Sequence, residues 1–191
     1  AGIDHGLTVI DTAEMYADGG AEEVVGQAIR GLRDRVVLVS KVYPWHAGKA
    51  AMHRACENSL RRLQTDYLDM YLLHWRGDIP LQETVEAMEK LVAEGKIRRW
   101  GVSNLDTDDM QALWRTADGE HCATNQVLYH LASRGIEYDL LPWCQQHSLP
   151  VMAYCPLAQA GRLRDGLFQH TDIINMANAR GVTVAQLLLA W

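Results

Sequence analysis

The chain has 191 residues, 48% hydrophobic and 22% charged, which is typical of a globular domain with a sizeable core. A formal net charge of −6 argues against nucleic acid or an anionic membrane as the main partner. No apolar run is long enough for a membrane span, and no signal-peptide pattern is visible. The four cysteines form neither a CxxC pair nor a disulfide framework, so a reducing cytoplasm is the expected compartment.

Short apolar runs alternate with helix-like patterns along the chain. The runs predict parallel strands, because a strand that is buried on both faces needs no polar alternation. The predicted strands are Leu7–Asp11, Val36–Ser40, Tyr67–Leu73, Arg99–Val102, Ala123–Leu128 and Pro150–Tyr154.

Apolar residues spaced by three and four predict the intervening helices. Such stripes run from Met52 to Leu63 and from Leu81 to Val92. Pro80 fits a first helical turn, Gly95 fits the residue after a helix end, and Asp106 is a good N-cap. The helix that Asp106 would cap carries Met110, Leu113 and Trp114, and a further helix pair is expected around Thr171–Ala179 and Thr183–Trp191.

Polar residues stand at the ends of the six apolar runs. They are Asp11, Lys41, His74, Ser103, Gln126 and Tyr154. In a parallel β/α barrel the carboxyl ends of all strands open on one face, so these side chains are expected around one pocket. An open Rossmann sheet is disfavoured because no Gly-rich fingerprint follows the first strand. A barrel fits better, although it closes with eight strands.

Several segments match known family signatures: Val9–Tyr16, Val39–Lys41, Tyr71–His74, Gly101–Asn104, Asn125–Gln126 and Ala153–Leu157. They resemble the signatures of the aldo-keto reductases, in that family's order. The bacterial branch that reduces small aldehydes and diketogluconate-like compounds is the most similar. The resemblance implies a (β/α)8 TIM barrel whose first and eighth strands are missing here, so residues 1–191 are expected to be a single barrel domain that is incomplete at both ends.

Four residues acquire catalytic roles in this interpretation. Reduction of a carbonyl builds negative charge on its oxygen, so a proton donor must stand beside it. Tyr16 is the expected donor, and a cationic Lys41 favours its phenolate form. Asp11 is expected to hold Lys41, while His74 orients the carbonyl oxygen. Each alone has an ordinary structural explanation, such as a helix cap or a buried aromatic, but together they favour catalysis.

The resemblance also implies NADPH, in preference to NADH, as the cofactor. Hydroxyl and amide groups suit the nicotinamide carboxamide, and an aromatic ring suits the nicotinamide face. The segment that grips the 2′-phosphate in the family is not among these residues. The implied cofactor contacts are Asp11, Ser103, Asn104, Gln126, Tyr154, Cys155, Pro156 and Leu157.

The substrate is expected to be a small carbonyl compound, such as a 2-oxoaldehyde or a keto sugar. Aromatic residues just beyond strand ends favour an apolar rim around it. The expected substrate contacts are Tyr16, Tyr43, Trp45, His74 and Trp75. A monomer is the family expectation.

Two alternative functions stay open. A metal hydrolase would use some of the eight histidines, but none lies in an HxH or HExxH arrangement, and no metal is expected. A barrel that binds nicotinamide cofactor as a sensor or partner subunit would keep the fold with little turnover. Turnover on a panel of aldehydes distinguishes this second alternative from a reductase.

Overall fold

The computed structural model describes residues 2–159 and 161–191. Its internal contacts divide the chain into two compact units, residues 1–125 and 126–191. The strand order follows the chain within each unit, so every crossover connects neighbouring strands.

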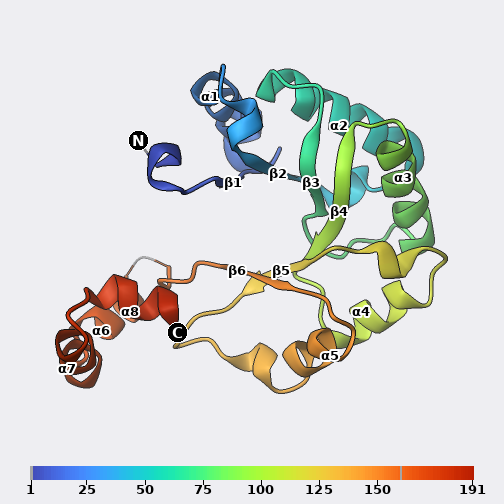
Figure 1. Ribbon diagram of the computed structural model, residues 1–191. Coiled ribbons are helices and arrows are strands. Elements are labelled where there is room, and N and C mark those ends of the chain that lie inside the picture. The colour runs from blue at the N-terminus through green and yellow to red at the C-terminus, as the bar shows by residue number, and fades with distance from the viewer. Residues whose placement is uncertain (1, 160) are drawn as a thin grey trace. The chain divides into compact units, whose positions relative to one another are not determined.

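The first unit is a parallel sheet with helices in its crossovers (Figure 1). Register is fully parallel from the first strand to the fourth. Its strands are β1 (Val9–Asp11), β2 (Val37–Val42), β3 (Leu68–Leu73) and β4 (Ile97–Ser103). Its helices are α1 (Gly20–Ala28), α2 (Lys49–Leu63), α3 (Leu81–Ala93) and α4 (Thr107–Trp114), with short 3-10 turns η1 (Ile3–His5), η2 (Tyr16–Gly19), η3 (Arg33–Arg35), η4 (Pro44–His46) and η5 (Gly119–His121).

Helices α2 and α3 bury the apolar stripes that the sequence predicts. Met52, Cys56 and Leu63 are fully buried on α2, and Val85 and Met88 are fully buried on α3. The stripe on α3 ends one residue earlier than predicted, because Leu91 is buried while Val92 is only half-buried. The two stripes supply a large share of the unit's core, which the hydrophobic effect stabilises.

A buried ion pair holds α1 and α2 against β2. The Glu22 carboxylate on α1 is fully buried and accepts a hydrogen bond from Ser40 Oγ on β2 at 2.6 Å. Arg62 on α2 donates to the same carboxylate from Nε, also at 2.6 Å. A buried charge costs free energy unless it is paired and hydrogen-bonded, so these contacts specify how the helices dock.

Three residues were expected at particular positions of helix ends, and the prediction is confirmed for two of them. Asp106 caps α4 by accepting a hydrogen bond from the Asp109 N–H at 2.9 Å. Gly95 follows α3 with a left-handed φ of +71°, and Lys96 N–H donates to Leu91 O across it. Pro80 is the N-cap residue rather than a member of the first turn, because its ψ of 133° is extended.

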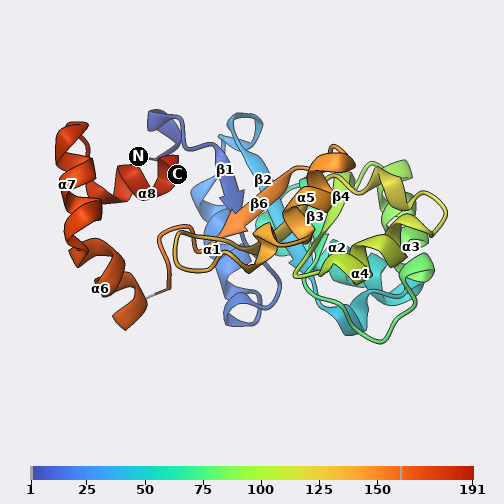
Figure 2. The same cartoon turned by 90° about the horizontal axis from the view of Figure 1, so that it is seen from below.

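In the second unit, the described residues form two neighbouring strands and four helices. Helices α6, α7 and α8 lie together in it (Figure 2). Its elements are β5 (Asn125–Leu128), which starts at the unit boundary, β6 (Val151–Tyr154), α5 (Leu140–Gln146), α6 (Arg162–Gln169), α7 (Thr171–Ala179), α8 (Val184–Ala190) and the turn η6 (Gly135–Glu137). Among the described residues no single helix has the length and composition to cross a membrane; α7 and α8 pass that test only as a pair bent by 88°.

All six predicted strands are present, with shifted ends. Strand β2 extends two residues beyond its predicted end at Ser40, so that Lys41 lies inside the strand. Helices α5 and α6 are not among the predicted elements: α5 carries Pro142 in its first turn, and each of the two is at most eight residues long, which leaves little room for a repeating stripe.

Gly101 on β4 allows the close approach of the next segment of the sheet. A Cβ at this position would lie 2.6 Å from the Thr124 carbonyl oxygen, which is backbone and cannot rotate away. We expect Gly101→Ala to lower the free energy of unfolding by about 1–3 kcal/mol, the usual cost of overpacking. Denaturant unfolding monitored by circular dichroism measures it.

Gly166→Ala is the matched control for that substitution. Gly166 lies in α6, and an added Cβ meets nothing within 4 Å. Alanine is a better helix former, so this variant should be neutral or more stable by up to about 1 kcal/mol. Equal stability of Gly101→Ala and wild type would contradict the close-approach explanation.

Candidate active site

Parallel register brings four polar side chains to one face of the first unit. Asp11 pairs with Val39, Lys41 with Leu72, and Leu72 with Gly101. Side chains alternate between the two faces of a strand, so Asp11 and Lys41 point to the same side. His74 comes two residues after Leu72 and Ser103 two residues after Gly101, so both continue the same alternation. Ser40, with the opposite parity, contacts α1. The face that carries Lys41 is therefore the one turned away from the helices.

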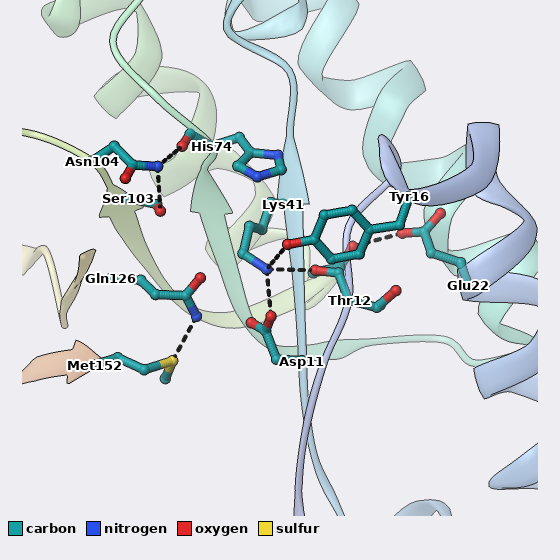
Figure 3. A network of polar contacts seen from close by, with 11 residues as sticks. Asp11, Thr12, Tyr16, Glu22, Lys41, His74, Ser103, Asn104, Gln126 and Met152 are labelled. Carbon is teal, nitrogen blue, oxygen red and sulfur yellow. Dashed lines mark hydrogen bonds and ion pairs between the residues drawn. The ribbon is translucent and has the colours of Figure 1, made fainter. Parts of the chain in front are cut away.

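Lys41 is the centre of a compact polar network (Figure 3). Lys41 is fully buried, with 0% of its surface exposed. The ammonium Nζ donates to Asp11 Oδ2 at 2.6 Å and to the Thr12 carbonyl oxygen at 2.9 Å. It also lies 3.4 Å from the hydroxyl of Tyr16. Three oxygens thus replace the water that a buried ammonium loses.

The environment of this network shifts two pKa values. Burial lowers the pKa of Lys41, and the negative charge of Asp11 opposes that shift. Burial, followed by the positive charge of Lys41, lowers the pKa of His74 to about 4. His74 is therefore neutral near pH 7.

Tyr16 reaches this network from the turn η2, which directly follows β1. Its ring meets the His74 ring edge-on, with centroids 5.8 Å apart at 81°. The next two residues, Ala17 and Asp18, both have left-handed φ angles near +50°, which cost energy in residues other than glycine. The Tyr16 hydroxyl lies 3.4 Å from Lys41 Nζ, which places the phenol beside the buried ammonium (Figure 3).

Ser103 and Asn104 lie beside His74 at the end of β4. Asn104 Nδ2 donates to the His74 carbonyl oxygen at 3.0 Å and to Ser103 Oγ at 3.1 Å. Asn104 has a left-handed φ of +59°, which asparagine tolerates better than most residues. The pair presents a hydroxyl and an amide beside the main chain of His74, and such groups can bind a carboxamide.

An aromatic rim formed by Tyr43, Trp45 and Trp75 stands next to this site. Tyr43 stacks on Trp45 with centroids 4.3 Å apart and rings inclined by 20°. Trp75 meets Tyr43 edge-on at 6.0 Å and lies 4.9 Å from the His74 ring. Trp45 is 59% exposed, so the rim borders solvent. The structure therefore brings all three predicted rim residues together.

The remaining predicted cofactor contacts belong to the second unit. Gln126 Nε2 donates to Met152 Sδ at 2.8 Å (Figure 3), and burial raises the pKa of Tyr154. Cys155 has a left-handed φ of +53°, and its carbonyl accepts from Ala158 N–H at 2.8 Å. Pro156 and Leu157 lie within that turn.

Sequence reasoning missed two participants in the site. Thr12 contributes a main-chain carbonyl oxygen, and no side-chain pattern signals such a contact. Glu14 contacts the rim segment through its carboxylate, and a charged residue within the otherwise uncharged stretch between Asp11 and Tyr16 was the available signal. Within residues 2–159 and 161–191, no group of three or more His, Cys, Asp or Glu side chains is placed to hold a metal ion.

Comparison with known proteins gives a consistent result. The chain is 69% identical to methylglyoxal reductase YeaE of Escherichia coli strain K12, over all of this chain and 67% of that protein. It is 36% identical to glyoxal reductase of Bacillus subtilis strain 168, over all of this chain and 66% of that protein. The chain thus spans about two thirds of the length of these relatives.

Solved structures agree with the sequence matches. A crystal structure of an aldo/keto reductase from Klebsiella pneumoniae, in complex with NADP and acetate, is 98% identical and superposes with a TM-score of 0.96. That alignment covers all of this chain and 67% of the crystallised one. The predicted barrel class, with six strands in this chain, is confirmed by this likeness.

The sequence profile of the aldo/keto reductase family matches residues 1–191, the whole of the chain. The predicted enzyme class, an aldo-keto reductase, is confirmed by this match together with the named relatives. The chain belongs to the aldo/keto reductase family.

Proposed function

We propose that this site reduces small 2-oxoaldehydes to hydroxy compounds with NADPH. The observation that carries the proposal is the position of the Lys41 ammonium, 2.6 Å from Asp11 and 3.4 Å from the Tyr16 hydroxyl. A buried cation beside a phenol favours the phenolate, which is the state that a proton donor must reach when it gives up its proton. The names of the two reductase relatives support the substrate class.

The chemistry of the side chains supports the cofactor. NADPH, when bound, supplies the hydride. Ser103 and Asn104 would hold its carboxamide next to His74, because they offer a hydroxyl and an amide there. Gln126, Tyr154 and the turn from Cys155 to Leu157 are proposed as further cofactor contacts from the family resemblance. The NADP complex of the 98% identical protein supports the same choice.

Tyr16 donates the proton in this mechanism. Charge develops on the carbonyl oxygen as the reaction proceeds, and the phenol transfers its proton to that oxygen. The Lys41 ammonium stabilises the phenolate that remains. Asp11 keeps Lys41 in place and balances its charge, so the buried network stays close to neutral overall.

His74 orients the carbonyl oxygen from a second direction. A neutral imidazole carries one N–H, and Nδ1 of His74 is buried without a hydrogen-bond partner in the described part of the chain. The proton on Nε2 is then available to the substrate oxygen. A neutral donor adds no second cation next to Lys41, which the low pKa of His74 supports.

The aromatic rim supports a substrate with a flat, compact carbonyl group. Stacked aromatic faces and edges provide apolar contact without hydrogen-bond demands. A panel of methylglyoxal, glyoxal, phenylglyoxal and a keto sugar tests the substrate class through kcat/KM. The highest values should fall on the 2-oxoaldehydes. NADPH binding without turnover on any of them would instead select the sensor or partner-subunit alternative.

Tyr16→Phe should abolish most of the reductase activity while NADPH affinity stays near that of wild type. The variant removes the proton donor and retains the ring, so the rate should fall by at least about 100-fold. Steady-state kinetics and a fluorescence titration with NADPH measure the two quantities. Tyr138→Phe removes the hydroxyl of a 96% exposed tyrosine and should have no effect. A Tyr16→Phe enzyme with most of the wild-type kcat would exclude Tyr16 as the donor.

Lys41→Met should slow the same step and change its pH dependence. Without the cation the phenol holds its proton more firmly, so the alkaline decline of the reductive kcat should move to higher pH. The pH profile of kcat reports this shift. Lys90→Met, at a 71% exposed side chain on α3, is the control. An unmoved profile in an active Lys41→Met enzyme would rule out the proposed influence of Lys41 on Tyr16.

His74 should make the protein sensitive to acid. Its folded pKa of about 4 is below the usual value of 6.5, so the unfolded chain binds this proton first as the pH falls. The contribution of neutral His74 to the free energy of unfolding is fully present above pH 6.5. It is lost as the pH falls towards 4, by at most about 3 kcal/mol. His74→Gln should lose less stability than wild type between pH 7 and pH 4.5, measured by urea unfolding. His5→Gln, at an exposed histidine, is the control, and parallel curves for His74→Gln and wild type would contradict the assignment.

A further inference from the structure

Glu14 connects the turn that carries Tyr16 with the segment that carries the rim. It lies two residues before Tyr16, and its main-chain N–H donates to the Lys41 carbonyl oxygen at 3.3 Å. Its carboxylate oxygen Oε1 accepts a hydrogen bond from the Tyr43 N–H at 2.7 Å. The same oxygen lies 3.1 Å from His46 Nδ1. One side chain thus contacts both ends of the segment from Tyr43 to His46.

The burial of Glu14 makes these contacts costly to lose. Its side chain is only 7% exposed. A carboxylate in such a position needs donors to replace water, and the short bond to a main-chain N–H is of the stronger, charge-assisted kind. The Tyr43 N–H in turn points at this carboxylate rather than at solvent. The start of the rim segment is therefore tied to the Tyr16 turn by a directional contact.

The rim depends on where this segment lies. Within it, His46 N–H donates to Tyr43 O, which closes the turn η4, and Trp45 stacks on Tyr43. On the other side, the segment packs tightly on the loop after β3, because a Cβ at Gly77 would lie 2.5 Å from Pro44 Cβ. An open pocket of about 160 Å³ is lined by Glu14, by His46 and by α2 residues that include Arg54. The segment is thus held both by the Glu14 carboxylate and by the close contact between Pro44 and Gly77.

We infer that Glu14 is a positioning residue that sets the place of the Tyr43–Trp45 pair, and through it the fit of the substrate. The inference rests on the proposed carbonyl reductase function and assigns to Glu14 no contact with the reacting atoms. Glu14 acts through the Tyr43 N–H. Asp11, Lys41 and Tyr16 keep their own contacts without its carboxylate.

Loss of the contact between Glu14 and the Tyr43 N–H should change KM much more than kcat. The rim contacts a substrate equally before and during the reaction, so its displacement removes binding that the ground and transition states share. Glu14→Ala should therefore raise KM for methylglyoxal by roughly 10-fold with kcat within about 3-fold of wild type. The larger phenylglyoxal, which reaches further along the rim, should lose more. Glu14→Gln keeps a carbonyl oxygen for the Tyr43 N–H and should restore KM to within about 2-fold.

Glu83→Ala is the matched control. Glu83 Oε1 also accepts a main-chain N–H, that of Lys49 at 3.2 Å at the start of α2, but the contact is exposed and lies outside the rim. Its KM should equal that of wild type. Should Glu14→Ala fail to fold, Glu14→Asp retains the charge but shortens the reach by one methylene, and it should raise KM in the same way.

A readout without turnover separates this inference from the proposed function. The contribution of Trp45 to the near-ultraviolet circular dichroism is the difference between wild type and Trp45→Phe. Glu14→Ala should lose most of that contribution and Glu14→Gln should retain it, whether or not the wild type reduces any aldehyde. The inference is overturned if the Trp45 signal survives in Glu14→Ala, if kcat and KM are unchanged there, or if Glu14→Gln behaves like Glu14→Ala.

Discussion

The structure of the first unit depends on the burial of one ammonium group. Lys41 lies inside a strand with no exposure, and its charge would be prohibitively costly there without oxygen partners. Those partners are Asp11 at the end of β1 and the carbonyl of Thr12 just beyond it. Satisfying the ammonium therefore also fixes the end of β1 and the start of the turn that carries Tyr16. The same requirement that stabilises the fold assembles the reactive groups.

Adjacent residues of β2 divide the roles of scaffold and site. Ser40 points to the helices and bonds the buried Glu22 carboxylate, which Arg62 also contacts. Lys41 points to the opposite face and bonds Asp11. Because the side chains of a strand alternate, a shift of one residue in register would exchange the two. Lys41 would then lose Asp11, and the Glu22 carboxylate would lose the Ser40 hydroxyl. Two largely buried polar networks on opposite faces thus help to specify the register of the sheet, in addition to apolar packing.

Lys41 and His74 are neighbours in one site but differ in charge, because their partners differ. Lys41 keeps a carboxylate within hydrogen-bond distance, whereas His74 has burial and a nearby cation, both of which favour its neutral form. A cation that acts on a phenol and a neutral donor for a carbonyl oxygen are then available at one strand end. Glu14, a third type of buried group, contacts the segment that borders them. Within the short stretch from Asp11 to Tyr16, Asp11 and Tyr16 serve the proposed chemistry, and Glu14 serves the proposed fit of the substrate.

The sequence by itself determined the presence of the six strands, the apolar stripes of α2 and α3, and the caps at Asp106 and Gly95, because these features depend on periodicity and local signals. The order of the motifs was enough to indicate the family. The sequence did not reveal that Lys41 lies within β2, that the Thr12 carbonyl binds the Lys41 ammonium, or that Glu14 reaches Tyr43. Contacts of that kind join residues about thirty positions apart through strand register, and a main-chain carbonyl leaves no trace in the residue pattern. Only the tertiary structure decides them, since a buried polar atom selects its partner from whatever the packing brings within hydrogen-bond distance.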